Sequence, residues 1–142
     1  MHIRRPGITR TLTHTRLIPL PDASRTQVGL RGNRWQVQFF DSGRNLHSVW
    51  DTPLIERAHN WTFSEWADEI DRAGRAEQAI IVKGSPDDWA DETFNIATQV
   101  YNGTPVGSKL SYDYVSEWAP VVEQRLLFGG LRLAYILNGI YR

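Results

Sequence analysis

A change in hydrophobic spacing between residues 35 and 54 constrains the fold of this chain more than any other feature. Trp35, Val37 and Phe39 alternate with glutamines, a pattern typical of a half-buried β-strand. The spacing then becomes helical, with apolar residues three or four positions apart at Leu46, Val49, Trp50 and Leu54. The sequence therefore predicts a short β element near residues 34–40 followed by a helix. Because a single strand is not stable alone, its partner must come from elsewhere.

Two signals mark the ends of this first helix. Residues 41–45 predict a turn, and Asn45 at the end of that turn is a favourable N-cap. Pro53 disfavours helical backbone angles at Thr52, so we expect the first helical turns to end near Asp51.

Capping residues predict three longer helices in the rest of the chain. Thr62 and Glu65 have the spacing of a capping box, and Ser85 followed by Pro86 is a typical helix start. Another helix should begin at Ser111 and, after an interruption or restart at Pro120, run to about Asn138. The pair Gly129-Gly130 should destabilise it unless another backbone approaches closely there. The predicted fold class is mainly α, with one core that includes Trp50, Trp66, Trp89, Val100, Leu127 and Leu133.

Composition limits the classes of function. The 142 residues are 41% hydrophobic and 23% charged with zero formal net charge, which suits one globular domain without a global preference for nucleic acid. The apolar runs are too short to span a bilayer, so we expect no membrane segment. The chain contains no cysteine. Any metal site must therefore use histidine, aspartate or glutamate.

The first 34 residues differ from the rest, because they contain seven arginines and a single acidic residue, Asp22. A basic arm of this kind can contact phosphates, although a solvated leader without fixed structure is the commoner case. The segment also lacks the apolar run of a secretory signal, so we expect no export signal in the chain.

His47 and Asp51 form the strongest candidate site. Residues four apart share one face of a helix, so this pair could supply two ligands to a zinc ion or simply share a surface hydrogen bond. The apolar residues around the pair would hold such a helix against a core. His59, next to a predicted helix start, is expected to be exposed or capping, and His2 and His14 are weaker candidates. Four acidic residues near the start of the helix predicted at Ser85 are expected to be structural: Asp87, Asp88, Asp91 and Glu92.

Several ordered segments resemble one known family, the zinc-dependent, single-strand-specific nucleases of the S-one/P-one type. The most specific of them is "NLHSVWDTPLIE", which carries His47 and Asp51. The others are "RGNRWQVQFF", the pairs "WA" and "ET" in "DDWADETFNIATQVY", and "APVVEQRLLFGGLRLAYILNGIY". The resemblance covers about residues 28–142, which we expect to be the C-terminal part of a nuclease domain. Residues 1–27 would be an unmatched basic leader, either disordered or a misread segment.

The resemblance implies a helical fold related to zinc phospholipase C and truncated at its N-terminus. Family members bind three zinc ions, hydrolyse single-stranded DNA and RNA, and often remove 3′-phosphates from nucleotides. His47 and Asp51 would be two ligands of one zinc, and Asn33 would contact the substrate. The resemblance implies a secreted or periplasmic protein, although we expect no signal peptide in this chain.

The chain also departs from the family pattern, because the N-terminal residues that supply most zinc ligands are absent. We therefore expect at most one partial zinc site and little or no activity from these 142 residues alone. The alternative is a non-catalytic helical module that binds another protein. A helix face exposed by the missing half would also allow self-association.

Overall fold

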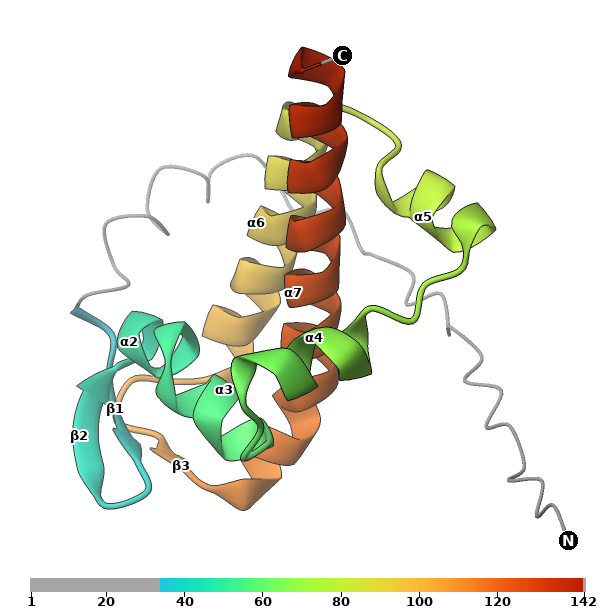
Figure 1. The fold of residues 1–142 in the computed structure, drawn as a ribbon. Coiled ribbons are helices and arrows are strands. Elements are labelled where there is room, and N and C mark those ends of the chain that lie inside the picture. The colour runs from blue at the N-terminus through green and yellow to red at the C-terminus, as the bar shows by residue number, and fades with distance from the viewer. Residues whose placement is uncertain (1–33, 142) are drawn as a thin grey trace, which may run out of the picture.

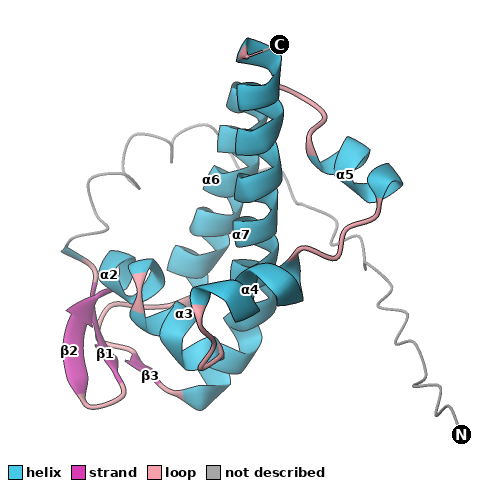
Figure 2. Cartoon of the chain, in the orientation of Figure 1, coloured by secondary structure: helices cyan, strands magenta, loops and turns pink. Residues whose placement is uncertain are grey.

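The computed structural model describes residues 34–141, which form a small three-stranded sheet and a set of helices (Figures 1 and 2). The mainly α fold class is therefore confirmed. Two short helices, α3 and α5, were not expected from the sequence. In chain order the elements are β1 (Gln36–Phe39), β2 (Ser42–Asn45), α2 (Leu46–Asp51), α3 (Pro53–Ala58), α4 (Phe63–Ile70), α5 (Arg75–Ile81), α6 (Pro86–Gly103), β3 (Lys109–Leu110) and α7 (Tyr112–Ile140).

The β1–β2 hairpin corrects the expectation of a turn over residues 41–45. The turn consists of Phe40 and Asp41 alone, and residues 42–45 pair antiparallel with β1, from Phe39 opposite Ser42 to Gln36 opposite Asn45. Phe40 has a positive φ of 53°, which is unusual for a bulky residue. Its ring lies under the Arg57 guanidinium at 4.5 Å, which holds this residue in place. The segment Ser-Gly-Arg-Asn has no strand-like alternation, so its pairing with β1 had no signal in the sequence.

The sheet is completed from the other side by β3, which pairs parallel with β1 in the order β2-β1-β3. The Gln38 N–H donates to the Ser108 carbonyl and the Phe40 N–H to the Leu110 carbonyl, both at 2.8 Å. The partners of the predicted strand thus come from within this chain, one next to it and one about 70 residues later. The strand therefore needs no partner from outside this chain.

The core lies between this sheet, helices α2 and α3, and the first half of α7. Its buried members are Val37, Phe39, Leu46, Val49, Leu54, Val100, Leu110, Tyr114, Val115 and Val122.

The predicted core list was only partly right. Val100 is in this core and Trp50 packs against it. Trp66, Trp89 and Leu127 are half-buried and lie outside the cluster. Leu133 is 58% exposed, so its predicted place in the core was wrong. Helical spacing identifies an apolar face, but it does not tell which part of that face is covered.

Helix α7 runs unbroken through Pro120 for 29 residues, which corrects the expected interruption. Proline removes one N–H, and here Ser116, whose carbonyl loses that donor, is exposed to water. A Cβ placed at Gly129 or Gly130 would meet no atom within 4 Å. No close backbone approach therefore accounts for the two glycines among the described residues.

Helices α6 and α7 lie side by side (Figure 1) and are joined by ion pairs. Glu92 of α6 accepts hydrogen bonds from Arg125 at 2.5 Å and from Arg132 at 2.6 Å. Arg132 also donates to the Ile81 carbonyl at 3.0 Å, which ties in the end of α5. Asp88 caps its own helix together with Ser85. The expected structural role is thus confirmed for Glu92 and Asp88.

None of the helices in residues 34–141 combines the length and the apolar character that a membrane span requires.

Candidate metal site

Helix α2 carries the candidate pair, and its start is fixed by Asn45. The Asn45 side-chain oxygen accepts from the Ser48 N–H at 2.8 Å, while the Ser48 hydroxyl donates back to the Asn45 carbonyl at 2.8 Å. Asn45 has extended backbone angles, as an N-cap residue should. The helix ends at Asp51 and Pro53 begins α3, so both predicted ends are confirmed.

Buried side chains and two hydrogen bonds hold the inner face of α2 against the rest of the fold. Leu46 and Val49 are fully buried in the core. The Leu46 N–H donates to the Trp35 carbonyl at 2.8 Å, and the Trp50 indole N–H donates to the Tyr114 hydroxyl at 2.9 Å. These contacts fix the rotation of a six-residue helix that could not be stable alone.

His47 and Asp51 lie on the opposite, outer face. His47 Nε2 is 3.3 Å from Asp51 Oδ2, and the two side chains are 62% and 58% exposed. The sequence-based expectation that they share a face open to solvent is confirmed. An exposed pair of this kind contributes little to stability, so the fold does not depend on it. An imidazole nitrogen and a carboxylate oxygen at this spacing have the donor chemistry of two corners of a zinc tetrahedron.

No third ligand stands beside this pair among the residues that the structure describes. Across residues 34–141, no group of three or more His, Cys, Asp or Glu side chains is placed to hold a metal ion. Asn33, His2 and His14 lie outside the described residues, as does the predicted leader, residues 1–27. The residues present therefore fit two ligands of a metal site rather than a whole one.

His59, expected to be exposed or capping, has a more specific place. It occupies the C-cap position of α3, and its Nε2 lies 2.7 Å from Glu123 Oε1 on α7. Its ring stacks on Trp61 at 3.6 Å and meets Trp66 edge-on at 5.3 Å. This half-buried cluster fastens the α3–α4 connection to α7. No local pattern indicated this contact, because Glu123 lies 64 positions away from His59.

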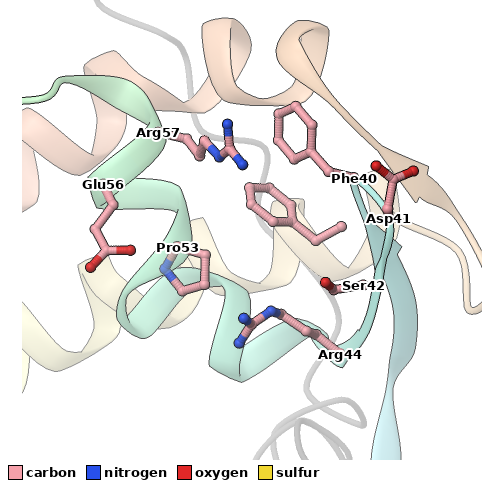
Figure 3. A pocket seen from close by; sticks show the side chains of 8 residues that line it. Phe40, Asp41, Ser42, Arg44, Pro53, Glu56 and Arg57 are labelled. Carbon is pink, nitrogen blue, oxygen red and sulfur yellow. The ribbon is translucent and has the colours of Figure 1, made fainter.

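A hollow lies between the β1–β2 hairpin and α3. In the sequence, the hairpin precedes α2 and α3 follows it. The hollow is lined by Phe39, Phe40, Asp41, Ser42, Arg44, Pro53, Glu56 and Arg57. Figure 3 shows the Arg44 and Arg57 side chains between these two elements. Two arginines and two carboxylates line the hollow, so its charges balance and it has no net preference for an anion.

Comparison with known proteins supports the family resemblance. The family model described as S1/P1 Nuclease matches residues 18–142. Endonuclease 2 of Arabidopsis thaliana is 32% identical over 127 residues, a match that covers 78% of this chain and 43% of the relative. Endonuclease 3 and Endonuclease 4 of the same plant are 30% and 28% identical, over 43% and 42% of their lengths.

The chain thus spans less than half the length of the curated relatives that it matches. The family match nevertheless includes the hairpin, the α2 pair and the whole of α7. On this evidence the chain belongs to the S1/P1 nuclease family.

Proposed function

We propose that this chain is part of a zinc-dependent endonuclease that hydrolyses phosphodiester bonds of single-stranded DNA and RNA. By the same family resemblance, the enzyme would remove 3′-phosphates from nucleotides. His47 and Asp51 would be two ligands of one zinc ion. The observation that supports this role most directly is the exposed His47–Asp51 pair, 3.3 Å apart on a helix whose other face is fixed in the core.

The chain's own contribution is the orientation of these two donors. Asn45 fixes the start of α2 and Trp50 fixes its rotation, so the imidazole and the carboxylate project to the same side. A supported platform of this kind is what metal ligands need, because loosely held side chains bind metals poorly. When bound, zinc ions in such sites lower the pKa of a water molecule and stabilise charge on phosphate oxygens.

The same reasoning predicts weak binding and little activity from the 142 residues alone. A catalytic zinc has three protein ligands plus a water, and the described residues bring two together. Asn33 stays a proposed contact to the substrate, and family members bind three zinc ions, of which this chain would hold at most one partial site. The arginines at the start of the chain could still bind nucleic acid by charge, with an affinity that falls steeply with salt.

Zinc titration of the purified chain by calorimetry, together with a single-stranded DNA digestion, tests the proposal. We expect weak zinc binding that His47→Ala and Asp51→Ala each abolish. Asp68→Ala, which removes an exposed carboxylate from α4, is the control and should leave binding unchanged. Zinc affinity that is the same in His47→Ala as in the wild type would rule out the assigned ligands. Robust cleavage lost in that variant would show that the chain supplies ligands beyond these two.

The alternative, a non-catalytic module that binds another protein, is favoured by one observation. Large apolar side chains are exposed along the second half of α7, among them Leu133, Ile140 and Tyr141. A purified chain that binds no zinc and forms a stable complex with an unrelated protein would support this alternative.

A further inference from the structure

Helix α7 has one continuous apolar stripe of which only the first half is covered. Residues three or four positions apart lie on one face of a helix. Along α7 this face begins with Val115, Trp118 and Val122. It continues with Leu126, Gly129, Leu133, Leu137 and Ile140. We call the part from Leu126 to Ile140 the open stripe.

The first half of the stripe is an interface within the chain. Val115 and Val122 are buried members of the core, and Trp118 packs against it. Helices α3 and α4 lie against this half of α7. The open stripe continues the same face, yet Leu133 is 58% exposed and Ile140 is 65% exposed. The exposed leucines are thus an extension of an interface that already exists, rather than scattered surface residues.

The charges of α7 avoid the open stripe. Arg132 is the only charged residue between positions 126 and 141. Its side chain is buried on another side of the helix, against Glu92 and the Ile81 carbonyl. The stripe therefore offers an uncharged surface about four turns long. The open space above Gly129 and Gly130 would let another backbone come close to α7.

We propose that the open stripe is the docking surface for the part of the S1/P1 nuclease domain that this chain does not span. The family match includes α7 to its end, whereas the chain spans only 43% of Endonuclease 2. The remaining part of the domain must pack on some face of the matched part. The open stripe is the extension of the core interface, and its occupant would be an amphipathic helix from that remaining part. This inference rests on family membership and on α7, and it does not depend on the proposed zinc site.

Co-expression tests the proposal with the full 142-residue chain. The probe is the segment of Arabidopsis thaliana Endonuclease 2 that this chain does not match, made as a separate polypeptide. We expect a one-to-one complex whose recovery falls about tenfold or more in Leu133→Asp and in Leu137→Asp. Tyr135→Asp is the matched control, because Tyr135 is equally exposed but lies on the far side of α7. Its complex should be recovered like that of the wild type.

A second variant separates loss of docking from loss of folding. In Gly130→Leu the new side chain enters open space, and leucine has a higher helix propensity than glycine. The chain alone should therefore melt at the same temperature or higher. The same variant should reduce recovery of the complex, because it blocks close approach of the partner helix. The proposal is overturned if Leu133→Asp leaves recovery unchanged or if no complex forms. It is equally overturned if the open stripe instead joins two copies of this chain, seen as a dimer that Leu133→Asp dissociates.

Discussion

The indole N–H of Trp50 donates to the hydroxyl of Tyr114 at 2.9 Å, across 64 positions of sequence. This hydrogen bond joins α2, which carries the candidate metal ligands, to the first turn of α7. Trp50 also meets Trp118 edge-on at 5.5 Å, so the contact has a polar and an aromatic part. The orientation of the His47–Asp51 pair thus depends on Trp50, which lies between the two residues in sequence but points toward α7.

Trp50→Phe should lower the free energy of unfolding by about 1 kcal/mol beyond the effect of the smaller ring, because the hydrogen bond to Tyr114 is lost. Urea denaturation of Trp50→Phe, Tyr114→Phe and the double variant measures the free energy that this hydrogen bond contributes. We expect the double variant to be more stable than the sum of the single losses predicts. Strict additivity would show that the two side chains do not interact in solution.

Asn45→Ala should destabilise the chain by about 1 kcal/mol, since the Ser48 N–H loses its capping acceptor. The same change should weaken zinc binding, because the start of α2 then frays next to His47. Asn45→Asp keeps an acceptor at this position and is the control for both measurements. Equal zinc affinities of Asn45→Ala and Asn45→Asp would mean that the cap does not position the ligands.

Leu54→Ala should cost about 2–5 kcal/mol, because Leu54 is fully buried and its truncation leaves a cavity. Leu133→Ala removes the same atoms from a side chain that is 58% exposed, and its effect should stay within about 0.5 kcal/mol. Thermal or urea unfolding of the two variants provides the comparison. Similar losses in both would show that the second half of α7 is already covered in solution.

Glu92 gives the α6–α7 contact a defined dependence on pH. Burial raises the pKa of Glu92, but the hydrogen bonds and charges of Arg132 and Arg125 outweigh it and hold the pKa below its ordinary value of 4.5. A carboxyl whose pKa is lower in the folded state stabilises the fold above its unfolded pKa. This contribution is lost as the pH falls through the folded value.

Glu92→Gln should therefore lower stability near pH 7 by about 2 kcal/mol, because two arginines lose a charged acceptor. The difference from the wild type should shrink as the pH falls below about 4.5. Denaturation at a series of pH values measures it, with Glu69→Gln as an exposed control. A difference that does not change with pH would contradict the assigned titration.

Local signals in the sequence predicted the helix ends well. Asn45, Thr62 and Ser85 are N-caps as expected, because a capping side chain bonds to a backbone N–H only three positions away. The exposed His47–Asp51 pair was predictable for the same reason, since the spacing within one helix turn determines it.

Features that depend on distant partners were not predictable. Strand β2 has no strand-like pattern of its own and exists because β1 pairs with it. The contact between His59 and Glu123 joins residues 64 positions apart. Leu133 has the helical spacing of a core residue, but nothing in the described chain covers it. Which part of an apolar face is buried depends on tertiary packing.

The junction at Asn45 has a consequence for insertions and deletions. Asn45 is both the last paired residue of β2, opposite Gln36, and the N-cap of α2, so no linker separates sheet from helix. A one-residue change in the Phe40–Asp41 turn would shift the ladder by one position and turn successive side chains to opposite faces. Helix α2 would then rotate with the strand and carry His47 away from its outward direction. The length of this hairpin should therefore be invariant in any variant that still binds metal through His47 and Asp51.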